Sequence, residues 1–467
     1  YGVPGSGAVL HTLNIRLHAE ELAYIINHAG DSAIVVDKIL WPLFAPVRDR
    51  LGDIRILVID DDGDLPPGTL SYEQVVASAT PRDVLPDIDE RAAAVMCYTS
   101  GTTGRSKGVL YSHRSMVLHA LASGLPDCLN LRESDVALAV VPMFHVNAWG
   151  LPFACAMLGS SQVMPGPCLD AASIVELLAG ERVTFAAGVP TIWHGVLRYL
   201  DEHPGMTDTC YRLMVGGSAA PPAMIKAYQD RHDIEIIHGW GMTEMSPVGT
   251  LAIPPSAVEK GSDEYWRYRS AQGRLLVGVD GRLMGPDGSE QPWDGESVGE
   301  LEVRGPWITA SYYLNGTEND TDKDEMASKF SDDGWLRTGD VGALTPDGFL
   351  ILTDRSKDVI KSGGEWISSV DLENALMGHP AVKEASVVGV PDDKWGERPL
   401  ASVVLADGQS VTPDELSDNL EGKVAHWQVP ERWAFIDEVP KTSVGKFDKK
   451  VLRKRYADGE LDVKQLN

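Results

Sequence analysis

Cysteine is scarce in this sequence: there are five among 467 residues, and none has the spacing of a metal-binding motif. They are Cys97, Cys128, Cys155, Cys168 and Cys210. An odd number of scattered cysteines excludes a disulfide-stapled secreted domain and predicts reduced thiols in a cytoplasmic protein.

Long hydrophobic runs are also lacking. No stretch approaches the roughly 18 apolar residues of a membrane span, and no signal peptide is recognisable, so the sequence predicts no transmembrane segment. The chain opens at Tyr1 in what reads as ordered sequence. We therefore expect a further N-terminal segment to precede it.

Acidic residues outnumber basic residues in this sequence. The 41 Lys and Arg against 68 Asp and Glu give a formal net charge of −27. Nucleic acids attract basic faces, so this charge argues against a nucleic-acid partner. The length predicts more than one domain, with enough apolar sequence for a large core.

Short β-branched runs alternate with helical stretches over most of the chain. Residues 32–37, 54–59 and 137–141 are predicted buried strands, and residues 19–29 and 172–179 have helical periodicity. This alternation is typical of an α/β fold with largely parallel sheets. Residues 278–302 predict an antiparallel β section, and the acidic residues 316–330 predict an exposed surface element.

After residue 354 the pattern changes. A charged, glycine-bearing stretch, DRSKDVIKSGG, precedes a compact α+β region with a helix at 370–376 and strands at 384–390 and 401–405. We predict a large N-terminal domain, residues 1–354, and a small mobile C-terminal domain, residues 355–467.

Residues 98–109, YTSGTTGRSKGV, combine hydroxyls, glycines and a lysine as a polyphosphate-wrapping loop requires. The candidate nucleotide ligands are Thr99, Ser100, Gly101, Thr102, Thr103, Gly104 and Lys107. The loop resembles that of the adenylate-forming (ANL) superfamily of acyl-CoA synthetases, adenylation domains and luciferases. Ser106 replaces that family's usual proline, which we expect to loosen the loop without removing its donors.

Residues 238–244, HGWGMTE, predict an adenine and metal site. Flanking glycines let Trp240 lie flat on a planar ring, Thr243 can donate to a phosphate, and Glu244 suits a divalent cation. The alternative is a buried aromatic turn. By resemblance this is the family's adenine motif, in which tyrosine commonly replaces Trp240. Further candidates there are His238, Gly239, Gly241 and Met242, with Gly217, Ser218 and Ala219 of the GGSAAP segment; Thr99 joins Glu244 as a candidate metal ligand.

Residues 333–342, DGWLRTGDVG, place a carboxylate at Asp340 in a tight turn that suits bidentate hydrogen bonding to ribose hydroxyls. The segment resembles the signature of the fatty-acid–CoA ligase branch, which includes 3-methylmercaptopropionate–CoA ligases. The resemblance implies that Arg355 contacts the nucleotide and that the C-terminal domain pivots at Lys357. It also implies that Lys446, in PKTSVGKFDKK, is the catalytic lysine; a solvated basic tail is the alternative.

Two weaker segments concern the acyl group and CoA. PMFHVNAWG, residues 142–150, resembles the family segment beside the substrate carboxylate, with His145, Trp149 and also Gly241 as acyl-pocket candidates. A core histidine and tryptophan are the alternative. SGGEWIS, residues 362–368, supplies the CoA-side candidates Ser362, Gly363, Gly364, Glu365 and Trp366. The alternative for this segment is a simple loop.

The motifs together predict an ATP-dependent acid–CoA ligase that uses ATP, Mg²⁺ and coenzyme A on an aliphatic carboxylic acid. The substrate is a medium- or long-chain fatty acid or a short acid such as 3-methylmercaptopropionate. The main alternative is a stand-alone adenylation enzyme that loads a carrier protein, which the absence of a carrier segment disfavours. A luciferase-like oxygenase has only the shared fold in its favour, and a non-catalytic regulator is disfavoured by Lys446. The sequence leaves open whether the chain forms a homodimer.

Overall fold

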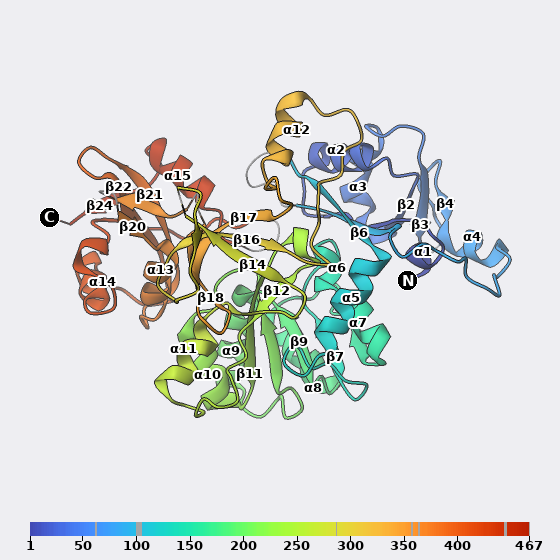
Figure 1. Ribbon diagram of the computed structural model, residues 1–467. Coiled ribbons are helices and arrows are strands. Elements are labelled where there is room, and N and C mark those ends of the chain that lie inside the picture. Colours follow the sequence, from blue (N-terminus) through green and yellow to red (C-terminus); the bar gives the residue numbers. More distant parts are fainter. Residues whose placement is uncertain are drawn as a thin grey trace.

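The computed structural model describes residues 1–60, 63–99, 105–285, 287–355, 358–362, 365–442 and 446–466, with backbone alone for 354–355 and 365–366. Its largest sheet has the strand order β15-β14-β16-β17-β18-β13-β12-β11-β10-β9-β7-β8 (Figure 1). The strands are β7 (Val136–Ala139), β8 (Ser161–Val163), β9 (Phe185–Gly188), β10 (Arg212–Val215), β11 (Glu235–Gly241), β12 (Val248–Leu251), β13 (Gly273–Leu275), β14 (Asp280–Met284), β15 (Glu290–Gln291), β16 (Gly299–Arg304), β17 (Leu336–Leu344) and β18 (Phe349–Arg355).

Part of this sheet is parallel and part antiparallel. Strands β8, β7, β9, β10 and β11 are mutually parallel, and the chain crosses between them through helices. The crossover helices are α8 (Ala171–Gly180), α9 (Pro190–Glu202) and α10 (Pro222–His232). From β11 to β15 every pairing is antiparallel. The predicted antiparallel section at 278–302 is therefore confirmed as β14, β15 and β16.

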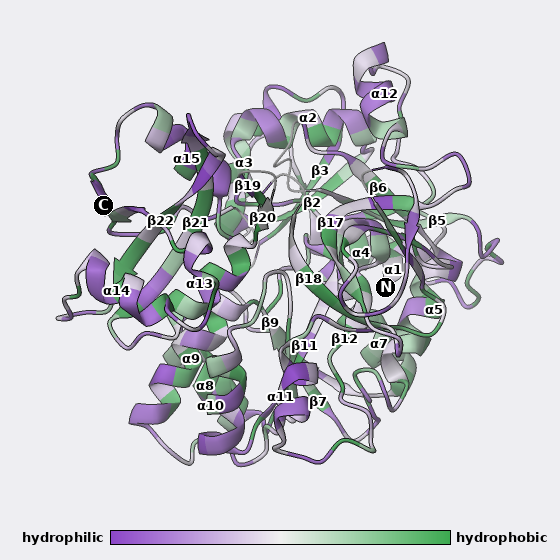
Figure 2. Cartoon of the chain, turned by 60° about the vertical axis from the view of Figure 1, so that its left-hand side comes forward, coloured by the Kyte–Doolittle hydropathy of each residue, from purple (hydrophilic) through white to green (hydrophobic). Residues whose placement is uncertain are grey.

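Cores on both faces of the parallel strands explain why these strands are apolar runs in the sequence. All four residues of β9 and of β10 are buried. Side chains of α8, α9 and α10 pack on this sheet, with the wholly buried Trp193 among them. In Figure 2 the outward parts of α10 and α11 (Asp263–Ser270) are hydrophilic.

The N-terminal region carries two three-stranded sheets, β2-β3-β4 and β1-β5-β6. Their elements are α1 (Gly2–Gly5), β1 (Leu10–His11), α2 (Ala19–Ala29), β2 (Ala33–Asp37), η1 (Lys38–Leu40), α3 (Trp41–Arg48), β3 (Arg55–Ile59), β4 (Leu70–Ser71), α4 (Tyr72–Ser78), β5 (Ala93–Tyr98), β6 (Gly108–Ser112) and α5 (His113–Gly124). The prediction of fully buried strands is wrong for β2 and β3, in which buried and more exposed residues alternate. Only one face of this sheet packs on α2 and α3.

The C-terminal region forms a separate sheet, β20-β19-β22-β23-β24, with β21 paired to β22. Its elements are β19 (Ile360–Ser362), β20 (Glu365–Ile367), α13 (Ser369–Met377), β21 (Val382–Asp392), β22 (Gly396–Leu405), α14 (Pro413–Leu420), η3 (His426–Gln428), β23 (Arg432–Phe435), α15 (Lys449–Ala457) and β24 (Val463–Gln465). Strand β18 belongs to the large sheet and β19 to this one, and the domain boundary after residue 354 stays a prediction.

The remaining elements are α6 (Val146–Trp149), α7 (Leu151–Leu158), η2 (Thr243–Met245) and α12 (Asp320–Ala327). Helix α12 lies in the predicted acidic segment at the top of Figure 1, and Asn315 and Glu318 before it contact His28 of α2. It is mostly exposed, with Met326 as its buried residue. Within the described ranges, we find no helix with both the length and the apolarity to cross a bilayer.

Candidate active site

The two ends of the predicted phosphate loop are joined by hydrogen bonds. The amide of Thr99 donates to the carbonyl of Lys107 at 2.9 Å, and the amide of Lys107 donates to Thr99 Oγ1 at 3.0 Å. Ser100, Gly101, Thr102, Thr103 and Gly104 lie outside the described residues. The structure therefore fixes the base of the loop through Thr99 and Lys107.

The Lys107 side chain contacts an acidic helix and an aromatic ring. Lys107 is 9% exposed, and its ammonium donates to Glu325 of α12 at 2.6 Å. It also lies 5.6 Å from the ring centroid of Tyr312. One N–H of the Lys107 ammonium is thus donated to a carboxylate, and the contact of Lys107 with a polyphosphate stays a prediction.

Neighbouring residues tie the loop to α2. The buried Ser106 hydroxyl donates to Glu21 Oε1 at 2.8 Å, so the residue that replaces proline attaches the loop to that helix. At the other end, Tyr98 Oη is 2.6 Å from His28 Nδ1, and His28 Nε2 is 2.9 Å from Glu318. These contacts fix Ser106 and Tyr98; whether Ser106 loosens the loop stays a prediction, because residues 100–104 lie outside the described residues.

Strand β11 presents the adenine motif. Trp240 is 8% exposed, and its indole N–H donates to Asp340 Oδ2 of β17 at 2.8 Å. A side chain at Gly241 is excluded, since a Cβ there would lie 2.0 Å from the Pro247 carbonyl oxygen, and one at Gly239 would lie 2.8 Å from Leu251. Trp240 is therefore a buried strand residue with a direct hydrogen bond to the predicted ribose carboxylate.

His238 has a structural role. Its Nε2 accepts from the amide of Ala220 at 3.3 Å, and its Nδ1 is 3.0 Å from the carbonyl of Ala271. Burial lowers its pKa to about 4. A neutral imidazole with Nδ1–H satisfies both contacts and holds the loop that contains Gly217, Ser218 and Ala219 against β11.

Thr243 and Glu244 follow β11 in η2 and are held by tyrosines. Tyr111 donates to the Thr243 carbonyl at 2.7 Å, and Tyr312 donates to Glu244 Oε1 at 2.5 Å. The amide of Thr309 donates to the Glu244 carbonyl at 2.8 Å. Glu244 is 6% exposed, so its carboxylate is largely removed from bulk water.

The donor set fits Mg²⁺. Among the described residues, no cluster of three or more His, Cys, Asp or Glu is present that would enclose a metal ion. Mg²⁺ is commonly held by one or two carboxylates together with substrate phosphates and water. A single buried carboxylate at Glu244 fits that requirement. The role of Thr99 as a second metal ligand stays a prediction.

Lys446 lies at the loop that follows β10. A Cβ at Gly217, whose φ is +86°, would lie 3.6 Å from Lys446 Cε and 3.8 Å from the Trp149 ring. One at Gly216 would lie 3.3 Å from Trp149. The predicted catalytic lysine of the C-terminal region thus meets the predicted nucleotide loop and the predicted acyl-pocket tryptophan.

His145 precedes an unusual turn. Burial, and then the Lys446 charge, lower its pKa to about 3. The next four residues, Val146 to Trp149, all have φ between +47° and +58°. Left-handed backbone costs roughly 1–2 kcal/mol for each such L-residue and tends to persist at functional sites. The buried Asn147 anchors the turn, with Nδ2 donating to Thr12 at 3.3 Å.

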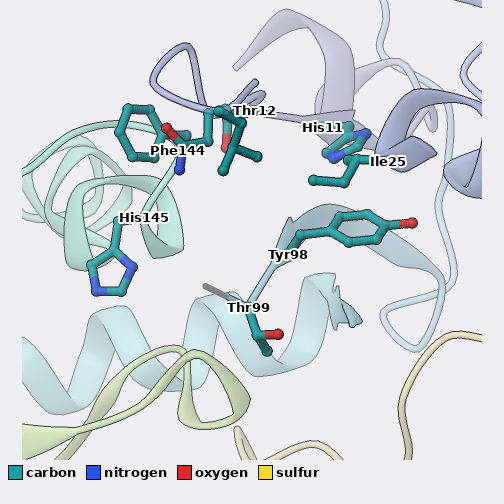
Figure 3. Close-up of a pocket in the computed structure, with 9 residues that line it drawn as sticks. His11, Thr12, Ile25, Tyr98, Thr99, Phe144 and His145 are labelled. Atoms are coloured by element: carbon teal, nitrogen blue, oxygen red, sulfur yellow. The ribbon is translucent and has the colours of Figure 1, made fainter. Parts of the chain in front are cut away.

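A cavity of about 20 Å³ joins Thr99 and His145 (Figure 3). It has room for about one water molecule, so it is far smaller than an acyl chain. Its lining consists of His11, Thr12, Asn14, Leu17, Ile25, Tyr98, Thr99, Phe144 and His145. The cavity therefore links the phosphate-loop base to the predicted acyl side.

The pivot and CoA candidates are described in part. Arg355 ends β18 with its backbone paired to Asp340, and Ser362 is buried and accepts from Arg398 at 3.2 Å. Glu365 and Trp366 open β20, described by backbone alone. Lys357, Gly363 and Gly364 lie outside the described residues.

Two residues of this site were not predicted from the sequence: Tyr312 and Glu325, which contact Glu244 and Lys107. Glu325 falls in the stretch predicted only as an exposed acidic element, and Tyr312 lies just before it. No local signal identifies them, because their partners are 68 and 218 residues away in the chain.

Comparison with known proteins shows which family this chain belongs to. The AMP-binding enzyme family matches residues 1–313, and the AMP-binding enzyme C-terminal domain matches residues 371–446. The chain is 48% identical to a long-chain-fatty-acid–CoA ligase of Thermus thermophilus, over 98% of this chain and 82% of that protein. It is 43% identical to a 3-methylmercaptopropionyl-CoA ligase of Ruegeria lacuscaerulensis, over 98% and 84%.

A solved structure shares the fold. The anthranilate CoA ligase AuaEII in complex with anthranoyl-AMP superposes with a TM-score of 0.87 at 25% identity, covering 98% of this chain and 85% of that one. With both family matches and relatives of over 40% identity along nearly its whole length, the chain belongs to the AMP-binding enzyme family of adenylate-forming acyl-CoA synthetases.

Proposed function

We propose that this protein is an ATP-dependent ligase that joins an aliphatic carboxylic acid to coenzyme A. The observation that carries the proposal is the approach of Lys446 to Gly217 and His145. One ammonium from the C-terminal region meets the nucleotide loop where an acid and an α-phosphate would react.

In the first step, a carboxylate oxygen of the acid attacks the α-phosphorus of ATP, and the bond to pyrophosphate breaks. The Lys446 ammonium stabilises the charge that develops on the α-phosphate. Trp240 supplies a flat ring for adenine, and Asp340 accepts hydrogen bonds from ribose hydroxyls. Glu244 would hold Mg²⁺, and the bound ion would neutralise phosphate charge.

In the second step, the CoA thiolate attacks the acyl carbonyl carbon, and AMP leaves with the electron pair of the broken C–O bond. His145 stays neutral because its pKa is about 3. A neutral imidazole can donate to the substrate carboxylate without adding charge, while the ring of Trp149 borders the acyl group. The C-terminal domain moves between the steps, with Lys357 as its pivot.

The proposed substrate is a fatty acid or a short aliphatic acid such as 3-methylmercaptopropionate. The relatives named above support both ends of this range. A screen of AMP release over acids from acetate to palmitate, with 3-methylmercaptopropionate, tests it in the presence of CoA or of a phosphopantetheinylated carrier protein. CoA-dependent turnover supports the ligase. Turnover with the carrier alone would replace it with the carrier-loading alternative.

A further inference from the structure

The segment of residues 309–327 runs along the proposed phosphate site and contacts it at several points. The Thr309 amide donates to the Glu244 carbonyl at 2.8 Å, and the Tyr313 amide donates to the Gly108 carbonyl at 2.8 Å. Glu325 accepts from Lys107 at 2.6 Å. The segment is thus fixed both to η2, which carries Glu244, and to β6, which follows the phosphate loop.

Tyr312 lies at the centre of these contacts. Its hydroxyl donates to Glu244 Oε1 at 2.5 Å, and its ring centroid is 5.6 Å from Lys107 Nζ. The side chain is 7% exposed and its ring packs edge-on against Phe330, with centroids 5.9 Å apart. A buried phenol therefore touches the proposed metal ligand and lies beside the lysine at the base of the phosphate loop.

In this hydrogen bond the phenol O–H of Tyr312 is the donor, and the Glu244 carboxylate oxygen accepts. The hydrogen bond from Tyr312 to Oε1 restricts rotation of the Glu244 carboxylate about its Cγ–Cδ bond. It thereby fixes the direction in which the second oxygen is presented to a cation.

We propose that Tyr312 is a positioning residue for Glu244, orienting the carboxylate that receives Mg²⁺ with ATP. The inference rests on the proposed function and deepens it. Carboxylates that bind metals are themselves hydrogen-bonded, and loss of such an outer partner typically costs about 10–100-fold in metal affinity. The Tyr312 hydroxyl donates to Glu244, so its effect on the metal is exerted through that carboxylate.

The test is the Mg²⁺ dependence of ATP binding, measured by calorimetry on the full chain without acid, so that no reaction occurs. Tyr312→Phe keeps the ring and its packing and removes only the hydroxyl. We expect the half-saturating Mg²⁺ concentration to rise about tenfold or more. Tyr313→Phe, which removes the hydroxyl of the next tyrosine, is the matched control and should leave it within about twofold of the wild type.

Equal Mg²⁺ dependence in the two variants overturns the proposal. If Tyr312→Phe lowers the thermal midpoint, Glu244→Gln with and without Tyr312→Phe decides the matter. Because both substitutions act on one carboxylate, adding Tyr312→Phe to Glu244→Gln should change the half-saturating Mg²⁺ concentration by less than about twofold. If the two effects multiply instead, Tyr312 does not act through Glu244. A wild type that binds MgATP but releases no AMP with any acid and CoA would refute the proposed function and leave this inference standing.

Discussion

Replacing Lys446 by alanine should separate the two half-reactions. The end of the Lys446 side chain lies beside Gly217, and its charge acts on His145, where adenylate formation is proposed to occur. Loss of one preorganised electrostatic contact to a developing charge typically lowers the rate by about 100–1000-fold. We expect a loss of that size in acid-dependent pyrophosphate release, with thioester formation from supplied acyl-AMP and CoA falling less than about tenfold.

The structure adds a second readout for this variant. The Lys446 charge is the smaller cause of the low pKa of His145, after burial. Removing the charge should raise that pKa while burial keeps it below the ordinary value of about 6.5. The pH profile of the remaining adenylation activity should therefore show no new histidine titration above about pH 6.5.

The assays need a charge-matched control. Lys450→Ala removes one exposed cation from α15, close to Lys446 in the chain, and should leave both half-reactions unchanged. An equal loss in both half-reactions of Lys446→Ala would refute the reasoning. It would assign the lysine to folding or to CoA binding instead.

Three other contacts give predictions of their own. Trp240→Phe keeps an aromatic ring but removes the N–H that donates to Asp340. The KM for ATP should rise about tenfold, and discrimination against 3′-deoxy-ATP should fall. Unchanged discrimination would show that Trp240 has no part in ribose recognition. Glu325→Gln replaces the carboxylate that pairs with Lys107 by a neutral amide, so the lysine is freer to bind phosphate and the KM for ATP should fall severalfold. A higher KM would show that the ion pair stabilises the site instead of competing with ATP. His119 is buried with a pKa lowered to about 4, so it binds fewer protons in the folded than in the unfolded state and costs stability as the pH falls from about 6.5 to 4. His145 and His238 act in the same direction, so urea titrations should show that His119→Asn reduces the slope of stability with pH by roughly 1.4 kcal/mol per pH unit without abolishing it; an unchanged slope would contradict the assignment.

Local chemistry explains how much of the site was predictable. The glycine at 241 is required by the nearby Pro247 carbonyl, and Thr99 and Lys107 are close in sequence and close the same loop. Such features depend on residues a few positions apart, and a motif records them directly. The same holds for helix α2, whose predicted range matches the structure.

The half-burial of β2 and β3 was not predictable in the same way. A short β-branched run has the same composition whether helices cover one face of its sheet or both. Burial alternates along β2 and β3 because α2 and α3 pack on one face of this sheet alone.

The family, the order of the motifs and the candidates Thr99, Glu244, Asp340 and Lys446 were predictable from the amino-acid sequence. The contacts that these groups make depended on the folded chain. Trp240 reaches Asp340 across 100 residues. Sheet order and strand register set which distant side chains meet, and no local pattern encodes them.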